Sequence, residues 1–313
     1  MHDFIKKTAL SIGFDACGIA KAEELTSDAE FMKLWLSNGQ NGEMSYLNHN
    51  FEKRVDPRVL VPNCKSIVVV LLNYYPEEKQ NISSPKIAKY AYSEVDYHTI
   101  IKTMLNKLEQ LICSEYGSKI INSDYQHLFV DSAPVLERRW AQRAGLGWIG
   151  KHTQLIQPGL GSYTFIGVLM LNIETAYDVP VKDRCGSCSR CIDACPTKAL
   201  SIGTLNATRC ISYLTTENKN EIPPEFHNKL SGYAIGCDIC ADVCPWNNKW
   251  AIPTTHTELS PNAKVLHWDE KSWQQLSIKE FNHVFRHSAI KRAGFNKLKQ
   301  NIQTLSKDTV NPE

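Results

Sequence analysis

The fold of the second half of this chain is decided by Cys185-Gly-Ser-Cys188-Ser-Arg-Cys191-Ile-Asp-Ala-Cys195-Pro196. A related stretch follows, Cys237-Asp-Ile-Cys240-Ala-Asp-Val-Cys244-Pro245, and Cys210 lies between the two. Cysteines spaced by two residues, then a further cysteine after three more and a proline, are typical of ligands to 4Fe–4S clusters. We therefore expect two such clusters and a protein whose chemistry moves electrons.

The number of cysteines agrees with this expectation, because two cubane clusters with four thiolates each need eight. In bacterial ferredoxins the fourth cysteine of a run ligates the other cluster. The second run lacks one inner cysteine, and Cys210 is expected to fill that vacancy. One cluster would then be held by Cys185, Cys188, Cys191 and Cys244, and the other by Cys195, Cys210, Cys237 and Cys240.

Paired cysteines have two other common uses in proteins. Zinc is also bound by Cys-x-x-Cys pairs, but zinc sites rarely continue into this longer run that ends in proline. A disulfide framework fits less well still, because the chain is long and carries no secretory signal. The clusters are the favoured interpretation.

Composition excludes several classes of protein. Of the 313 residues, 42% are hydrophobic and 22% charged, which is ordinary for a soluble globular protein. The net charge of +2 indicates neither a nucleic-acid-binding protein nor a membrane-binding one. The longest apolar run, Ile67–Leu72, is too short to cross a bilayer. We expect a cytoplasmic protein without a membrane partner.

Residues 1–176 alternate helical and strand-like segments, which predicts an α+β chain whose first domain is a mixed, layered one. The β-branched run 66–73 is typical of a strand buried on both faces. The other expected elements are a helix opened by a capping box at Ser27–Glu30, a helix capped by Asp96 and ended by Gly117, a strand at 128–130, a helix from Pro134, and a strand at 163–173.

Two further segments differ from the first. Residues 177–250 show little periodicity and hold all eight paired cysteines, so we expect a two-cluster domain that folds only with iron. Residues 251–313 are polar and then helical, and they form a basic tail. A basic run is usually a solvated face, yet Arg286, Lys291 and Arg292 are the best candidates for phosphate contacts.

A family resemblance extends over nearly the whole chain. Val130-Asp-Ser-Ala-Pro-Val-Leu-Glu-Arg-Arg-Trp-Ala-Gln-Arg-Ala-Gly-Leu-Gly-Trp-Ile-Gly-Lys-His-Thr153, followed by the cysteine runs, resembles epoxyqueuosine reductases. The matching pieces elsewhere are Arg54–Arg58, Asn73–Pro76, Asp96–His98 and Phe285–Arg292. The chain resembles a short form of the family, without the C-terminal helical repeats of longer members.

The resemblance implies a function and a second cofactor. That family binds cobalamin beside the two-cluster module and reduces epoxyqueuosine to queuosine at the wobble position of certain tRNAs. This implies tRNA and an external low-potential electron donor as partners, and we expect a monomer. There is no Asp-x-His-x-x-Gly run, because His98 is followed by Thr-Ile-Ile, so a histidine lower ligand of the methyltransferase kind is not indicated.

Asp131 is the candidate general acid, since opening an epoxide leaves an alkoxide that must be protonated. It lies between a strand and a helix, where α/β domains place ligands, and the family motif puts its catalytic aspartate here. For this role we expect burial to raise its pKa. The alternative is a plain helix N-cap carboxylate.

The resemblance assigns the glycine-rich loop 145–153 to the corrin pocket, where Gly150 would allow close approach and Lys151 and Thr153 would make contacts. It also places Arg54 near cobalamin, although a salt bridge to Asp56 is the alternative. His98 and His152 are expected to be structural histidines.

Two other functions remain open from the sequence. A corrinoid reductive dehalogenase would share the cofactors, but it usually carries a twin-arginine signal, which is absent here. A ferredoxin-type electron carrier without catalysis is the second alternative, and cobalamin binding would separate it from both enzymes.

Overall fold

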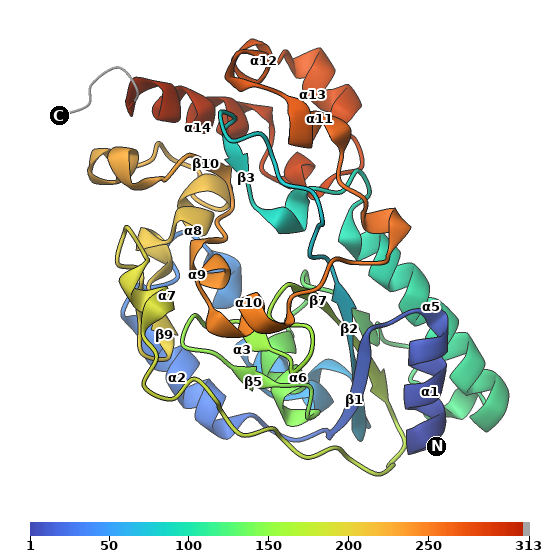
Figure 1. The fold of residues 1–313 in the computed structure, drawn as a ribbon. Coiled ribbons are helices and arrows are strands. Elements are labelled where there is room, and N and C mark those ends of the chain that lie inside the picture. Colours follow the sequence, from blue (N-terminus) through green and yellow to red (C-terminus); the bar gives the residue numbers. More distant parts are fainter. Residues whose placement is uncertain (309–313) are drawn as a thin grey trace.

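A four-stranded antiparallel sheet forms the centre of the first half of the molecule (Figure 1). The structure, a computed structural model, describes residues 1–308, so the tail predicted at 251–313 ends outside the described residues. The strands lie in the order β1 (Ala16–Lys21), β2 (Ser66–Asn73), β7 (Thr164–Leu171) and β4 (Leu128–Phe129).

Each face of this sheet carries its own hydrophobic core, because successive side chains of a strand point to opposite faces. On β2, Val68, Val70 and Leu72 pack with helices α1 (His2–Ile12) and α5 (Tyr97–Tyr116). The residues between them, Ile67, Val69 and Leu71, pack with α6 (Glu137–Arg143) on the other face. The predicted strand buried on both faces and the layered α+β arrangement are therefore confirmed.

The sequence predicted the ends of α5 correctly but not the beginnings of two other helices. Asp96 caps α5 by accepting a hydrogen bond from the His98 amide, and Gly117 follows the last residue, as predicted. The capping box at Ser27 was wrong: α2 (Thr26–Ser37) follows Leu25, and no side chain caps it. Pro134 also does not open a helix, because α6 begins at Glu137 after Leu136.

The cysteine-rich segment is made of short elements. Helices α7 (Arg190–Asp193) and α9 (Ile239–Asp242) each carry inner cysteines of one run and pack against each other. The hairpin of β5 (Trp148–Ile149) and β6 (Leu155–Ile156) lies beside them, in the lower part of Figure 1. Other helices and strands of this segment are β8 (Leu200–Ser201), β9 (Thr204–Leu205), α8 (Ile211–Thr216) and α10 (Pro245–Trp250). Two short helices of the first half of the chain are α3 (Phe51–Val55) and α4 (Pro57–Leu60).

The C-terminal segment packs on a third core at the top of Figure 1. Strand β10 (Tyr233–Ile235) pairs in parallel with β3 (Lys86–Ile87), so residues near 87 join this core although they belong to the first half of the chain. Among residues 1–308, no helix is long and apolar enough to span a membrane. The helices here are α11 (Ala263–His267), α12 (Glu270–Gln275), α13 (Ile278–Val284) and α14 (Phe295–Asp308).

Candidate functional site: two cysteine sets and an acidic cavity

The first cysteine set surrounds a small cavity. Its wall also includes the hairpin residues Lys151, His152 and Ile156, and Trp246 of α10. The fourth cysteine arrives from the second run, as the crossed arrangement requires. The cysteines of this set are Cys185, Cys188, Cys191 and Cys244.

The second set lines one part of a much larger cavity of about 450 Å³. The sequence could place Cys210 only by elimination, and the structure brings it to the other three at the start of α8. Among the described residues, no three His, Cys, Asp or Glu side chains come close enough to hold a single metal ion. The cysteines of this second set are Cys195, Cys210, Cys237 and Cys240.

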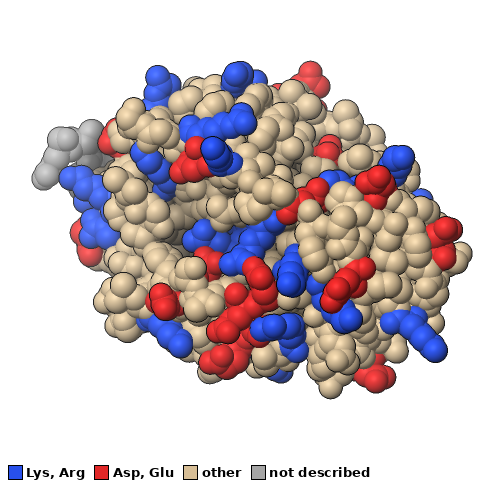
Figure 2. Space-filling view, turned by 90° about the horizontal axis from the view of Figure 1, so that it is seen from below, with Lys and Arg blue, Asp and Glu red and all other residues tan. Residues whose placement is uncertain are grey.

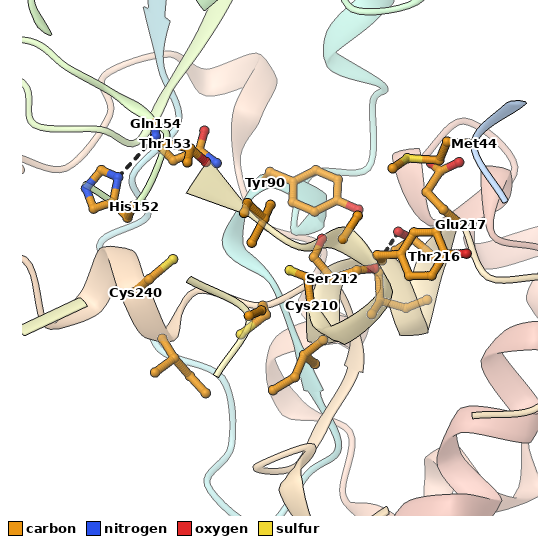
Figure 3. Close-up of a pocket in the computed structure, with 18 of the residues that line it drawn as sticks. Met44, Tyr90, His152, Thr153, Gln154, Cys210, Ser212, Thr216, Glu217 and Cys240 are labelled. Atoms are coloured by element: carbon orange, nitrogen blue, oxygen red, sulfur yellow. Dashed lines mark hydrogen bonds between the residues drawn. The ribbon is translucent and has the colours of Figure 1, made fainter. Parts of the chain in front are cut away.

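The large cavity extends from the second cysteine set to Asp131. Figure 3 shows Cys240 on the side of His152 and Cys210 beside Ser212 of α8, with Glu217 beyond Cys210 and Thr153 on the side of the hairpin. Tyrosines and apolar side chains alternate on its wall with a few charged groups. This combination suits a bulky ligand that is partly flat and partly polar.

Asp131, an exposed residue of the cavity wall, follows β4 after one intervening residue. Its backbone has φ +55, the left-handed conformation that aspartate tolerates better than most residues. Its carboxylate accepts a hydrogen bond from the Tyr97 hydroxyl at 2.9 Å, and His98 Nε2 lies 3.5 Å away. The Tyr97 ring is stacked on Phe165 of β7, which fixes the hydroxyl in place. Asp131 is not a helix cap, so that alternative was wrong.

The protonation of this group is the reverse of our expectation. The hydrogen bond from His98 holds the pKa of Asp131 below its ordinary value, although burial acts in the other direction. Burial alone would lower the pKa of His98, but its hydrogen bonds to Asp131 and Asp96 raise it to about 9. The half-exposed Asp131 is therefore ionised at neutral pH, and the nearby proton resides on His98.

Arg292 completes the acidic end of the cavity from the C-terminal segment. Its guanidinium lies 2.7 Å from Glu217 and 3.7 Å from Asp131. The other two residues predicted to read phosphates lie on the exterior: Arg286 is exposed, and Lys291 contacts Asn282. Of the three basic residues that the sequence grouped, Arg292 lines the cavity, and Arg286 and Lys291 do not. Figure 2 shows one face on which basic and acidic side chains are intermixed, with several of both meeting near its middle.

The residues that the resemblance assigned to cobalamin have different surroundings. Thr153 lines the large cavity, and its carbonyl accepts a hydrogen bond from Arg138. Lys151 instead donates to the carbonyls of Gly186 and Cys188, in the loop of the first cysteine set. A side chain at Gly150 would come within 2.6 Å of Ile156, so this glycine permits the hairpin to close.

Arg54 is buried beside the site without lining the cavity. Among the described residues, its one side-chain hydrogen bond is to the Tyr46 carbonyl at 3.4 Å, and its Nε has no partner there. The salt bridge to Asp56 was wrong, because Asp56 pairs with Arg58 at 2.7 Å.

Sequence reasoning missed two groups near Asp131. The sequence predicts a structural role for His98, although the Asp96-Tyr97-His98 run lies at the start of a predicted helix. Glu137 gave no signal at all. Burial raises the pKa of Glu137 to about 8, and its Oε1 lacks a partner among residues 1–308.

Comparisons with known proteins agree with this arrangement. A family model described as "Epoxyqueuosine reductase QueG, DUF1730" matches residues 54–132, and a "4Fe-4S double cluster binding domain" matches 184–247. The epoxyqueuosine reductase of Cellulophaga algicola is 45% identical over 97% of each chain. That of Vibrio cholerae is 35% identical, over 95% of this chain and 80% of its own.

Solved structures share the fold. A crystal structure of epoxyqueuosine reductase with an epoxyqueuosine-modified tRNA-Tyr stem loop is 32% identical, with a TM-score of 0.85. A structure of the Bacillus subtilis enzyme, also 32% identical and with a TM-score of 0.84, has its catalytic aspartate loop swung out of the active site. Each match covers 97% of this chain and 80% of the other.

Proposed function

This chain belongs to the epoxyqueuosine reductase family, and from that membership we infer that it reduces epoxyqueuosine to queuosine in tRNA. The observation that carries the inference is the joining, in one cavity, of a cysteine set to an aspartate–histidine pair. The family uses cobalamin and two 4Fe–4S clusters. Neither the dehalogenase nor the electron carrier is needed to account for these features.

The reaction sets the requirements of the site. An epoxide becomes an alkene when its oxygen leaves as water, which consumes two electrons and two protons. Bound cobalamin would supply a strongly reducing and nucleophilic cobalt, and the protein must position the substrate and deliver protons. Clusters near the cavity would supply the electrons one at a time.

The cysteine positions fit two clusters. Each set holds four sulfurs around open volume, and the crossed contribution of Cys244 and Cys195 matches the ferredoxin arrangement. We assign the first set to one cluster and the second set to the other, with Cys210 as the ligand that replaces the missing inner cysteine.

The large cavity is suitable for the corrin. Its volume and mixed lining are in the range of cofactor sites. Thr153 is the sequence-predicted contact that lies on its wall, and Arg54 adds a buried donor with an unused N–H nearby. Gly150 and Lys151 act indirectly in this proposal, because they shape the hairpin and the first cysteine loop.

The proton would reach the alkoxide from Asp131, with His98 as its store. A substrate that filled the cavity mouth would cover the half-exposed carboxylate. Desolvation raises the pKa of a carboxyl group and lowers that of histidine. Covering the pair therefore moves the proton from His98 to Asp131, which can then act as general acid within hydrogen-bond reach of the leaving oxygen.

The RNA would bind across the mouth of the cavity. Arg292 would contact the modified nucleotide, whereas Arg286 and Lys291 would contact phosphates outside the cavity. Proteins generally read RNA at unstacked loop bases, and a modified wobble base in a stem loop is such a target. The basic residues supply salt-dependent affinity.

The remaining assignments concern the setting of the enzyme. We place it in the cytoplasm, where tRNA is present and thiolates stay reduced. A monomer remains our proposal for its oligomeric state. An external low-potential electron donor is our proposal for the source of the electrons, because the reaction consumes two of them. The divisions at 176 and 250 remain our proposal for its domains.

A spectroscopic titration tests the function. Protein reconstituted without oxygen is loaded with cobalamin and reduced, and the epoxyqueuosine stem loop is then added. We expect the visible spectrum of reduced cobalamin to revert to an oxidised form in proportion to the stem loop. An unmodified stem loop is the control. If cobalamin binds but its spectrum does not change with the epoxide, the dehalogenase hypothesis would be favoured. If cobalamin does not bind, the electron-carrier hypothesis would be favoured.

A further inference from the structure

The β5–β6 hairpin forms the wall between the two cavities. Lys151, His152 and Ile156 line the small cavity of the first cysteine set. His152 also lines the large cavity, together with Thr153 and Gln154. The sequence assigned this whole glycine-rich loop to one ligand, but the structure gives it two faces.

One side of the hairpin already binds the first cysteine set. The indole Nε1–H of Trp148 lies 3.5 Å from Cys185 Sγ, within hydrogen-bond distance for sulfur. Trp148 is fully buried, and the rings of Trp246 and Trp250 pack edge-on against it. Lys151 holds the same cysteine loop through the Gly186 carbonyl at 2.7 Å.

His152 presents a further donor that nothing in the described chain accepts. The residue is 2% exposed. Its Nδ1 accepts a hydrogen bond from the Gln154 amide at 3.2 Å, so the ring proton lies on Nε2. Nε2 has no partner among residues 1–308. In Figure 3 that edge of the ring points away from the other labelled side chains of the large cavity.

We propose that His152 Nε2–H and Trp148 Nε1–H both donate hydrogen bonds to sulfur atoms of the first cluster and so raise its reduction potential. This rests on the cluster ligation proposed above. Reduction adds negative charge to a cluster, and N–H donors aimed at its sulfurs stabilise that charge. A buried N–H without an acceptor is unfavourable, so a sulfur facing His152 also explains its orphan donor.

Matched variants of one ring separate this role from a merely structural one. His152→Asn can retain an acceptor near the Nδ1 position while losing the Nε2 donor. His152→Gln reaches the Nε2 position with an amide N–H and should restore it. Trp148→Phe keeps an aromatic ring without its N–H. His267→Asn, at an exposed position, is the control.

The measurement is a potentiometric titration followed by electron paramagnetic resonance, on full-length protein reconstituted with iron and sulfide. The signal that survives in Cys210→Ser identifies the first cluster. We expect His152→Asn and Trp148→Phe to shift its midpoint to lower potential, while His152→Gln and the control match the wild type and the second cluster stays unchanged.

Two results would overturn the inference, and a third would concern its foundation. If the midpoint potential of the first cluster is unchanged in His152→Asn, His152 does not donate a hydrogen bond that tunes that cluster. If His152→Asn fails to load iron, Trp148→Phe decides the question. An unchanged midpoint potential of the first cluster in Trp148→Phe would then overturn the proposal that the hairpin raises that potential. If the wild type itself assembles only one cluster, the proposed ligation fails, which is a different outcome from two loaded clusters with unmoved potentials.

Discussion

His98 Nε2 lies 3.5 Å from the Asp131 carboxylate, while its Nδ1 lies 2.7 Å from Asp96. Both ring nitrogens therefore face a carboxylate, which favours the doubly protonated ring. The candidate acid of this site is thus a pair in which the aspartate faces the cavity and the histidine carries the resting proton.

The pair predicts a pH dependence with a definite sign. The pKa of His98 is raised to about 9, so the imidazolium persists at neutral pH and is lost as pH rises through about 9. We expect kcat/KM to fall there, together with the stability that the charged ring adds below its ordinary pKa. Asp96→Asn keeps a good helix cap but removes one charge, so the fall should move to lower pH. If kcat/KM falls at the same pH in the wild type and in Asp96→Asn, His98 is not the group whose proton the reaction needs.

Asp131→Asn should retain both clusters and cobalamin but lose turnover by about 100-fold or more, the usual contribution of a positioned acid. Asn preserves the size of the side chain and cannot deliver the proton. Asp124→Asn, at an exposed position, is the matched control. The check is single-turnover conversion of the stem loop with iron and cobalamin contents measured in parallel. Near-normal conversion by Asp131→Asn would remove it from the mechanism.

Arg292 and Lys291 are sequence neighbours with different surroundings, so their variants should differ. Arg292→Ala leaves Asp131 and Glu217 without their shared cation, and we expect both weaker stem-loop binding and slower turnover. Lys291→Ala should lower affinity slightly, more so at low salt, and leave kcat unchanged. Binding at several salt concentrations and steady-state kinetics provide the comparison. Equal effects on kcat would contradict the separation of the two residues.

Cys210→Ser should remove one cluster and retain the other. Cys210 lines the large cavity with the second set, so we expect the iron content to fall by about half while the first cluster keeps its spectrum. Cys113→Ser changes a cysteine outside both sets and should lose no iron. Full iron content in Cys210→Ser would mean that another residue is the eighth ligand.

Local sequence patterns predicted those features that depend on residues close together in the chain. The Asp96 cap, the strand 66–73 and the cysteine spacing all depend on near neighbours along the chain. The failures share a different cause. Phe31 and Leu34 of α2 are exposed although both are large and apolar, whereas Ala29 and Met32 are buried. Neighbouring segments decide which side of a helix is covered.

The same reason explains why some site residues have surroundings that differ from the prediction. Arg292 reaches Asp131 across 161 positions of sequence only because the C-terminal segment packs onto residues near 87. The direction of the Asp131 pKa depends on His98, which a strand end and a helix start bring together. Lys151 was expected at cobalamin, but the fold of the hairpin turns it to the cysteine loop. Such contacts cannot be read from spacing.

The most direct test of the account is the mass of the modified nucleoside after anaerobic incubation of the stem loop with fully loaded, reduced protein. The account predicts that epoxyqueuosine loses one oxygen atom to give queuosine, that this requires cobalamin, and that Asp131→Asn abolishes most of it. An unchanged nucleoside, with both clusters and cobalamin verified in the same sample, would contradict it.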